Sequence, residues 1–292
     1  MNAVAAFSKH RPLLFGIAYR MLGSVQDAED VVQEAYLRWE KADQGAVKSP
    51  KAWLSTVATR LSIDQLRSAR KQREVYVGEW LPEPLVTDDA APGAAAELAD
   101  SLSTAFLVVL ESLSPLERAA FLLKDVFDYD YKEIAEIVGK TPANCRQIVK
   151  RAREHVTQRH QRFDVDPAEQ ERMVLQFIDA TTRGDIDALV GALAEDAALH
   201  TDHGGKAIAA RRVIHGASKV ARFFVGVNQR FPQKNSEIQI RAINGRPGVI
   251  MYADGKPVTV ITFEVEAGHI KNIYVVRNPD KLKSLPKPGE IN

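Results

Sequence analysis

The sequence predicts a multidomain protein whose first half is all-α and whose second half is α+β. Apolar residues recur at helical spacing within residues 1–75 and 101–162. Between residues 236 and 277 the pattern changes to strand-like segments separated by turn residues. The most informative stretch, residues 130–154, reads DYKEIAEIVGKTPANCRQIVKRARE and has the pattern of a helix-turn-helix. The 292-residue length fits two or more domains.

Residues 1–75 have the pattern of a helical domain with one acidic and one basic helix. From Asp27 onward the apolar residues fall on one face of a helix, and the opposite face is largely acidic. Ser49 and Pro50 begin a later helix, since Ser is a favourable N-cap and Pro suits the first helical turn. The far end of that helix is basic, with Arg60, Arg67, Arg70, Lys71 and Arg73.

Residues 76–100 have the composition of an interdomain linker. Trp80, Leu81 and Pro82 lie near its start, and the prolines there prevent a continuous helix. From residue 79 to residue 117 the chain has eight acidic residues and no Lys or Arg. Composition alone favours a solvated tether.

Residues 101–162 have the pattern of a second helical domain that ends in the helix-turn-helix. Gly139 can adopt the positive φ that ends the first helix, Thr141 can cap the second, and Pro142 suits its first turn. The solvent face of the second helix carries Ala143, Asn144, Arg146, Gln147, Lys150 and Arg151. Arg and Lys can pair with guanine edges or phosphates, and Asn and Gln with adenine. The pattern favours DNA binding, although a surface hairpin with a solvated basic face would look the same.

Residues 167–285 change from helical to strand-like periodicity. Two helical patterns come first, and strands are then expected at 236–243, 248–253, 258–266 and 269–277. Turn residues separate these segments, so the strands should form an antiparallel meander. Helices followed by such a meander predict an α+β domain with a curved sheet wrapped on helices.

Composition limits the classes of protein that this chain can be. A formal net charge of +1 means that DNA binding must come from local basic patches. The single cysteine, Cys145, excludes an intrachain disulfide and a cysteine zinc cluster. The N-terminal apolar run is too short for a membrane span and too broken for a signal peptide. We therefore expect a cytoplasmic protein without a membrane partner.

Three motifs, in order, resemble bacterial sigma factors of the extracytoplasmic-function group. They are DAEDVVQEAY at 27–36, AWL at 52–54 followed by IDQLR at 63–67, and LSPLER at 113–118 leading into the helix-turn-helix. The resemblance covers residues 1 to about 160. It implies two all-α sigma domains and a protein that binds core RNA polymerase, recognises −35 and −10 promoter elements and starts transcription.

The resemblance also implies roles for individual residues. Docking on the polymerase clamp would involve the acidic helix through Asp30, Gln33, Glu34 and Leu37. Binding of the single-stranded −10 element would involve Trp53, Arg60, Asp64, Arg67, Arg70 and Lys71. Reading of the duplex −35 element would involve Thr141, Ala143, Asn144, Arg146, Gln147, Lys150 and Arg151. Trp53 could stack on a base, although a Trp at this spacing is more often part of the core.

The acidic linker would thread through polymerase toward the path of the RNA, as the corresponding connection does in sigma factors. Its carboxylates would then occupy a channel built for a polyanion. The residues that would do so include Asp88, Asp89, Glu97 and Asp100.

Residues 167–285 resemble the SnoaL-like domain, a cone-shaped α+β fold that a subgroup of these sigma factors carries at its C-terminus. The subgroup has three motifs, which here are Trp80-Leu81-Pro82, Asp202-His203-Gly204-Gly205-Lys206 and Asn278-Pro279-Asp280-Lys281-Leu282. His203 stands where the second motif has its first Gly, so a positive φ or close approach required there would be altered. The resemblance implies cis regulation through these segments, without a separate anti-sigma factor. Tight turns are the alternative interpretation of the last motif.

A second alternative for the C-terminal half is enzymatic. Isomerase relatives of this fold use an Asp base with a Tyr or Asp donor, and the candidate groups here are His200, Asp202, His203, His215, Tyr252 and Tyr274. The sequence has no nucleophile elbow and no metal-binding helix motif. We therefore expect no catalytic residue, no metal and no cofactor, and leave open an unidentified small ligand in this domain. Two alternative functions remain: a promoter-binding transcription factor that needs no polymerase, and a SnoaL-like cyclase or isomerase tethered to DNA.

Overall fold

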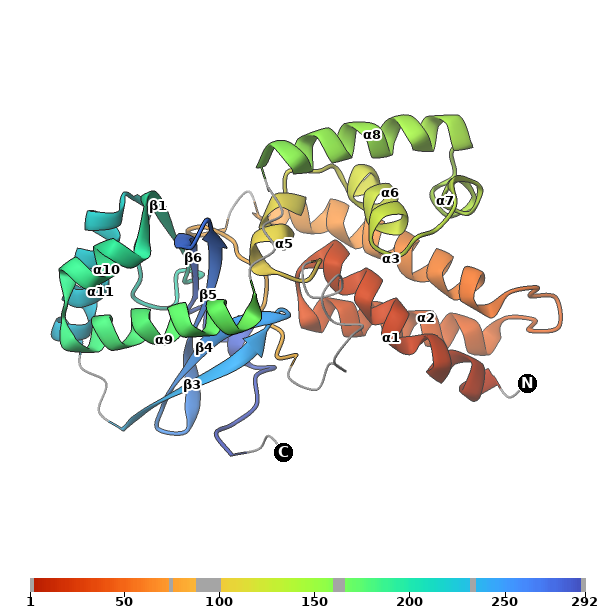
Figure 1. The fold of residues 1–292 in the computed structure, drawn as a ribbon. Helices are drawn as coiled ribbons and strands as arrows, with labels where there is room; N and C mark the ends of the chain where they lie inside the picture. Colours follow the sequence, from red (N-terminus) through yellow and green to blue (C-terminus); the bar gives the residue numbers. More distant parts are fainter. Residues whose placement is uncertain (1–2, 74–75, 88–100, 160–165, 232–234, 290–292) are drawn as a thin grey trace. The chain divides into compact units, whose positions relative to one another are not determined.

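The computed structural model describes residues 3–73, 76–87, 101–159, 166–231 and 235–289 (Figure 1), with residues 69–73 and 159 described by backbone only. The chain folds into two compact units. One comprises residues 1–75 and 107–161, and the other comprises residues 76–106 and 162–292. The segment 76–87, expected to be a linker, is thus grouped with the C-terminal residues. Among the described helices, none is long and apolar enough to cross a membrane.

The first unit is helical. Its helices are α1 (Ala3–Leu22), α2 (Val25–Lys41), α3 (Pro50–Arg73), α6 (Pro115–Asp125), α7 (Tyr131–Val138) and α8 (Pro142–Arg159), and the chain passes between the units within α5 (Thr104–Leu110). Helix α3 packs against α1, α2, α6 and α7. The all-α prediction for this part of the chain is confirmed.

Local signals in the sequence set the helix ends. Ser114 and Glu117 form a capping box at α6, and Asp130 and Glu133 form another at α7. Such boxes satisfy backbone N–H groups that have no partner inside the helix. Gly139 ends α7 at φ 67°, which a residue without a side chain adopts at little cost.

The second helix of the helix-turn-helix begins as its sequence predicts. The hydroxyl of Thr141 accepts a 3.2 Å hydrogen bond from the backbone N–H of Asn144. Pro142 is the first residue of α8. The inward positions Cys145, Ile148 and Val149 are buried. The helix-turn-helix geometry is therefore confirmed.

The second unit is α+β. A six-stranded sheet has the order β2-β1-β6-β5-β4-β3. The strands are β1 (Leu193–Asp202), β2 (Ile214–His215), β3 (Ser236–Ile243), β4 (Arg246–Ala253), β5 (Lys256–Glu266) and β6 (His269–Val276). The helices are α9 (Pro167–Arg183), α10 (Ile186–Ala192) and α11 (Ala217–Arg230), with a 3₁₀ turn η1 (Pro279–Leu282) after the last strand.

Strands β3 to β6 form the predicted antiparallel meander. Strand β1 was not predicted, and it pairs parallel to β6, so the sheet is mixed. One face of the sheet packs against α9, α10 and α11 (Figure 1), with a core that includes Val174, Phe177, Leu189, Val220 and Phe263. The parallel pairing brings the ends of β1 and β6 side by side, at Asp202 and Val276.

Candidate functional site

The predicted polymerase-binding residues lie together on one side of α2. Asp30 and Gln33 are exposed, and Leu37 keeps 40% of its surface exposed. Glu34 is half-buried and accepts a 2.7 Å hydrogen bond from Arg38. The opposite face of the helix packs into the core. The four residues therefore form one continuous surface with acidic and apolar parts.

The predicted −10 residues lie along α3, and they differ in what they contact. Trp53 is half-buried, with its ring centroid 5.4 Å from that of the buried Trp39. This contact gives Trp53 a packing role in the unit. Asp64 and Arg67 are exposed and form an ion pair at 3.2 Å. The side chains of Arg70 and Lys71 lie outside the described residues, as do Asp88, Asp89, Glu97 and Asp100 of the acidic linker.

Arg60 is tied to the end of α7. Its Nε donates to the carbonyl oxygen of Ile137 at 2.8 Å, and its Nη2 donates to that of Glu136 at 2.8 Å. Carbonyls in the last turn of a helix lack partners inside the helix, and a cation there also interacts favourably with the helix dipole. In this arrangement the guanidinium stabilises α7.

The predicted −35 residues all lie on the solvent side of α8 or at its start. Thr141, Ala143, Asn144, Arg146, Gln147, Lys150 and Arg151 are exposed. The guanidinium of Arg146 lies 5.2 Å from the ring centroid of Tyr131, which orients it. Arg153, outside the predicted set, is held by Asp125 through paired hydrogen bonds of 2.5–3.1 Å.

Within the first unit, α3, which carries the first of these basic surfaces, packs against α6 and α7, which in turn pack against α8. The hydroxyl of Tyr129 donates a 2.6 Å hydrogen bond to Ser55 on α3. Arg118 of α6 is buried and donates to the carbonyl of Met21 at 2.7 Å and to Glu111 at 2.8 Å. The regions before and after residues 76–106 are thus packed into one body.

The second unit contains a buried polar cluster, here termed the anchor, that joins Asp202 to the segment 76–87. The Asp202 side chain has no exposed surface. It accepts hydrogen bonds from the Tyr76 hydroxyl at 2.6 Å, from the Leu81 N–H at 2.9 Å and from Lys281 Nζ at 2.6 Å. Lys281 also donates to the Leu81 carbonyl. One carboxylate therefore connects β1, η1 and the segment that precedes residue 88.

Burial and the Asp202 charge both act on Tyr76. They raise the pKa of its hydroxyl well above the ordinary value, with burial as the larger cause. Tyr76 is accordingly a neutral hydrogen-bond donor at physiological pH. Its oxygen in turn accepts a 2.7 Å hydrogen bond from the Asn278 amide. A charged carboxylate with three donors is a well-satisfied buried group.

Aromatic and apolar residues cover the anchor. The ammonium of Lys281 lies 4.1 Å from the Trp80 ring centroid, within the range of a cation–π contact. Leu81 and Pro82 are buried. The structure therefore brings the predicted Trp80-Leu81-Pro82 segment into contact with Lys281 of the third motif.

The loop 203–206 lies beside the same segment. Gly204 has φ 54°, and a Cβ there would overlap the Asn278 amide and lie 3.0 Å from the Tyr76 hydroxyl. Lys206 pairs with Asp280, and the two hydrogen bonds from Lys206 and Lys283 lower the pKa of Asp280 to about 2. All three motif segments thus meet at the anchor.

The backbone at position 203 does not need the glycine that the motif has there. Its φ is not positive, whereas Gly78 opposite has φ 91°. A Cβ on Gly78 would lie 2.8 Å from His203 Nε2. The close approach is therefore provided by Gly78. His203 is buried, and its Nδ1 accepts a 3.0 Å hydrogen bond from the Gly205 N–H.

Residues that no sequence motif marks extend this contact. Tyr76 and Glu79 lie next to the recognised motif, and Glu79 contacts His200 Nδ1 at 2.8 Å. Farther along, the segment forms a β-bridge between Val86 and Ile243. Leu85 and Asn244 exchange hydrogen bonds of 3.2 and 2.7 Å across it. Residues 83–87 read EPLVT and lack the polar–apolar alternation of a strand, so the sequence offered no periodic signal for this bridge.

The side chains suggested for acid–base catalysis do not form one site: they lie in different places or are hydrogen-bonded to other groups. Asp202 and His203 belong to the anchor, and His215 is exposed. Tyr252 donates to the Pro286 carbonyl at 3.2 Å, and Tyr274 donates to Glu264 at 3.1 Å. Within the described residues, no group of three or more His, Cys, Asp or Glu side chains is placed to hold a metal ion.

Three known protein families match successive parts of the chain, in the order of its helical and α+β regions. A profile of sigma-70 region 2 matches residues 6–72, one of sigma-70 region 4 matches residues 103–156, and one of a SnoaL-like domain matches residues 174–273. The helical unit with its helix-turn-helix and the α+β unit therefore define a sigma factor that carries a SnoaL-like domain.

Similarity to individual proteins extends over nearly the whole chain. The ECF RNA polymerase sigma factor SigJ of Mycobacterium tuberculosis (strain ATCC 25618 / H37Rv) is 41% identical over 297 residues, which cover 97% of this chain and 94% of that protein. The chain belongs to the extracytoplasmic-function RNA polymerase sigma factors. Such proteins bind core RNA polymerase and promoter DNA, and they are not enzymes.

Two further comparisons agree. The probable ECF RNA polymerase sigma factor SigI of M. tuberculosis (strain CDC 1551 / Oshkosh) is 30% identical over 285 residues, covering 96% of this chain and 95% of that protein. The crystal structure of M. tuberculosis SigJ has a TM-score of 0.79 and 37% identity, covering 97% of this chain and 99% of that one. The resemblance inferred from the motifs is confirmed, and the tethered-isomerase alternative is wrong.

Proposed function

We propose that this sigma factor is regulated in cis by its SnoaL-like domain, which holds the segment 76–87 through the anchor. The observation that carries the proposal is the buried Asp202 carboxylate, which accepts from both Tyr76 and Leu81. This segment connects the two sigma regions along the chain. A domain that binds the connection controls how far the regions can separate, without a separate anti-sigma factor.

A contact within one chain can act at modest strength. Two groups on the same chain meet at a high effective concentration, so a small interface suffices to favour one arrangement over another. The anchor is more than a rim contact, because Asp202 is fully buried and Lys281 keeps only 12% of its side chain exposed. Loss of one partner from a buried ion pair typically costs about 3–5 kcal/mol. This energy is sufficient to shift a two-state arrangement.

The promoter elements require the two sigma regions to separate. The −35 and −10 elements are about 25 base pairs apart, which is about 85 Å along B-DNA at 3.4 Å per step. Helix α3 has 24 residues and is about 36 Å long, and it is bonded directly to α7 through Arg60. The packed first unit therefore suits a state that is not bound to both elements.

When the two sigma regions are apart, the role of each residue follows from its exposure and charge. The α2 surface of Asp30, Gln33, Glu34 and Leu37 would dock on polymerase. The solvent face of α8, with Arg146 and Lys150, would enter the major groove of the −35 element, where cations contact bases and phosphates. Along α3, the exposed Arg67 would track the backbone of the separated −10 strand. Arg60 would become available only when its contact with α7 breaks.

Run-off transcription with core RNA polymerase tests the proposal. The full chain and a chain that ends at residue 166 should differ in both polymerase affinity and transcript yield. Equal affinity and equal yield would refute cis regulation. A promoter-specific transcript from the shortened chain serves as the control that its sigma regions remain active.

A further inference from the structure

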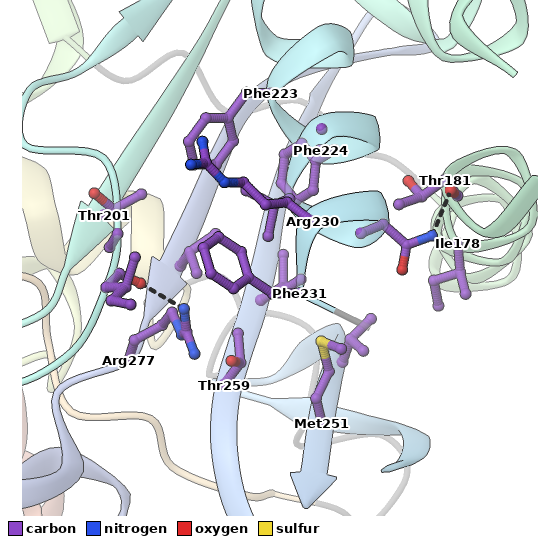
Figure 2. A pocket seen from close by; sticks show the side chains of 18 of the residues that line it. Ile178, Thr181, Thr201, Phe223, Phe224, Arg230, Phe231, Met251, Thr259 and Arg277 are labelled. Atoms are coloured by element: carbon purple, nitrogen blue, oxygen red, sulfur yellow. Dashed lines mark hydrogen bonds between the residues drawn. The ribbon is translucent and has the colours of Figure 1, made fainter. Parts of the chain in front are cut away.

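A cavity of about 870 Å³ opens in the second unit, between α9 and α11 and the helix-covered face of the sheet. Figure 2 shows the side chains around it. Its walls are mainly apolar and aromatic, with Phe223, Phe224 and Phe231 from the α11 side and Val249 and Phe263 from the sheet. A cavity of this size and lining is typical of sites for drug-sized ligands.

The charged groups of the cavity are all cationic. Among the described residues that line it are Lys206, Arg222, Arg230 and Arg277, and none of the described lining residues is Asp or Glu. Lys206 is already paired with Asp280, and Arg222 donates to Ser218. Arg222 keeps its charge, but two of its nitrogens are occupied by Ser218, so Arg230 and Arg277 are the lining cations that we consider for a ligand.

Arg277 is the more constrained of the two. It lies half-buried directly after β6, and its Nη1 donates to the carbonyl of Ile208 (Figure 2). Its Nε is buried and has no hydrogen-bond partner among the described residues, and the same holds for the hydroxyl of Thr181 across the cavity. Burial lowers the pKa of Arg277 from its ordinary value. A half-buried cation without a counter-charge carries a desolvation cost, which an anionic partner would offset.

The lining also indicates binding without turnover. None of the described lining residues is His, Tyr, Cys, Asp or Glu, the side chains that most often move protons in enzymes. The acid–base candidates His200, Tyr252 and Tyr274 do not line the cavity. Lys206 does line the cavity, but its ammonium is paired with Asp280. The lining is therefore suited to holding an apolar body and one anionic group.

We propose that this cavity binds an apolar small molecule that carries a single carboxylate or comparable anionic group. The apolar body lies among the phenylalanines, and the anion accepts hydrogen bonds from Arg277 and Arg230. Charge-assisted bonds of this kind are roughly twice as strong as neutral ones. The site would distinguish an acid from an alcohol with the same chain.

Calorimetric titration of the full-length protein with dodecanoate and with dodecanol tests the proposal. Dodecanoate should bind once per chain and at least about tenfold more tightly than dodecanol, the ratio expected for one charge-assisted hydrogen bond. Arg277→Met and Arg230→Met should each reduce that ratio while leaving dodecanol affinity nearly unchanged. Arg172→Met, an exposed position on α9 outside the cavity lining, should leave the ratio as it is.

Equal affinity for the acid and the alcohol, no binding of dodecanoate, or an unchanged ratio in both arginine variants would overturn the proposal. Using two variants guards against a folding defect at the half-buried Arg277, because Arg230 is exposed. Binding should persist in Asp202→Asn, which weakens the anchor without touching the cavity lining. Failure of cis regulation and failure of ligand binding are therefore separable.

Discussion

The Tyr76 hydroxyl donates a 2.6 Å hydrogen bond to Asp202, a carboxylate with no exposed surface that lies 126 residues later in the chain. The same carboxylate accepts from the Leu81 N–H and from Lys281. The segment that leaves the first sigma region is therefore folded as part of the SnoaL-like domain. This relationship underlies the predictions on the anchor.

Asp202→Asn should destabilise the second unit and release the segment 76–87. The amide keeps the size of the carboxylate but removes the charge that pairs with Lys281, which we expect to cost about 3 kcal/mol. Urea unfolding measures the loss. Hydrogen exchange of the Leu81 amide, which donates to Asp202, should become faster.

Asp196→Asn is the matched control for that variant. Asp196 also pairs with a lysine, Lys271 at 2.5 Å, but its side chain is 71% exposed. Exposed ion pairs contribute little to stability, because solvent screens them. Stability and Leu81 exchange should stay close to those of the wild type. Equal effects of the two substitutions would contradict the special role of the buried carboxylate.

Gly204→Ala should destabilise the second unit by about 2–4 kcal/mol, since it combines a positive φ with overlap against Asn278. Gly268→Ala provides the comparison. Gly268 also has a positive φ, but a Cβ there meets nothing within 4 Å, so only backbone strain of about 1–2 kcal/mol applies. Thermal unfolding of both variants isolates the close packing of Gly204 against Asn278 and the Tyr76 hydroxyl. Equal losses of stability in the two variants would argue against this close packing.

Lys150→Ala should weaken holoenzyme binding to a −35 duplex and reduce the salt dependence of binding by about one counterion. Lys150 is exposed, and its closest ion-pair partner, Glu154, is 4.0 Å away. Arg153→Ala should behave differently, because Arg153 is held by Asp125. It should lower stability and leave the salt slope unchanged. Titrations at several salt concentrations distinguish the two outcomes.

Cysteine-linked dyes can report the separation of the sigma regions. Gln26→Cys on α2 and Gln158→Cys on α8 place labels at exposed positions, in a background with the buried Cys145 replaced by Ala. Energy transfer should fall when the labelled protein joins polymerase and promoter DNA, because the contact between Arg60 and α7 must break. Unchanged transfer in an active open complex would contradict the requirement for separation.

The Lys206–Asp280 pair should stabilise the fold at neutral pH and lose this effect in strong acid. The pKa of Asp280 is lowered from 3.8 to about 2 by Lys206 and then Lys283. A depressed carboxyl pKa stabilises the folded state above the unfolded value, and the contribution is lost as pH falls between 3.8 and about 2. The stability difference between wild type and Lys206→Met should therefore be present at pH 7 and shrink below pH 4. A difference that grows on acidification would contradict this assignment.

Much of the fold was accessible from the sequence because its local signals agree with the tertiary structure. The capping residue Thr141, the positive φ at Gly139 and the strand 236–243 were all predicted and are confirmed. Strand β1 was missed because LAEDAALHTD lacks strand alternation. It is stabilised by parallel pairing with β6, and sequence periodicity does not encode such long-range pairing.

The candidate site could be predicted only in part, because the sequence does not encode its long-range contacts either. The anchor combines groups separated by up to 202 residues, as in the Asn278–Tyr76 hydrogen bond. Motif resemblance pointed to Asp202 and Lys281, whereas Tyr76, Gly78 and Arg277 carry no local pattern that marks them. Their importance comes from burial and contact, which only the folded structure displays.

The most direct test of the account is run-off transcription by core RNA polymerase with the wild-type chain, Asp202→Asn and Asp196→Asn. The account predicts that Asp202→Asn changes transcript yield several-fold and that Asp196→Asn matches the wild type. Equal yields from all three, in a preparation whose hydrogen exchange shows the segment 76–87 released from Asp202→Asn, would contradict regulation in cis.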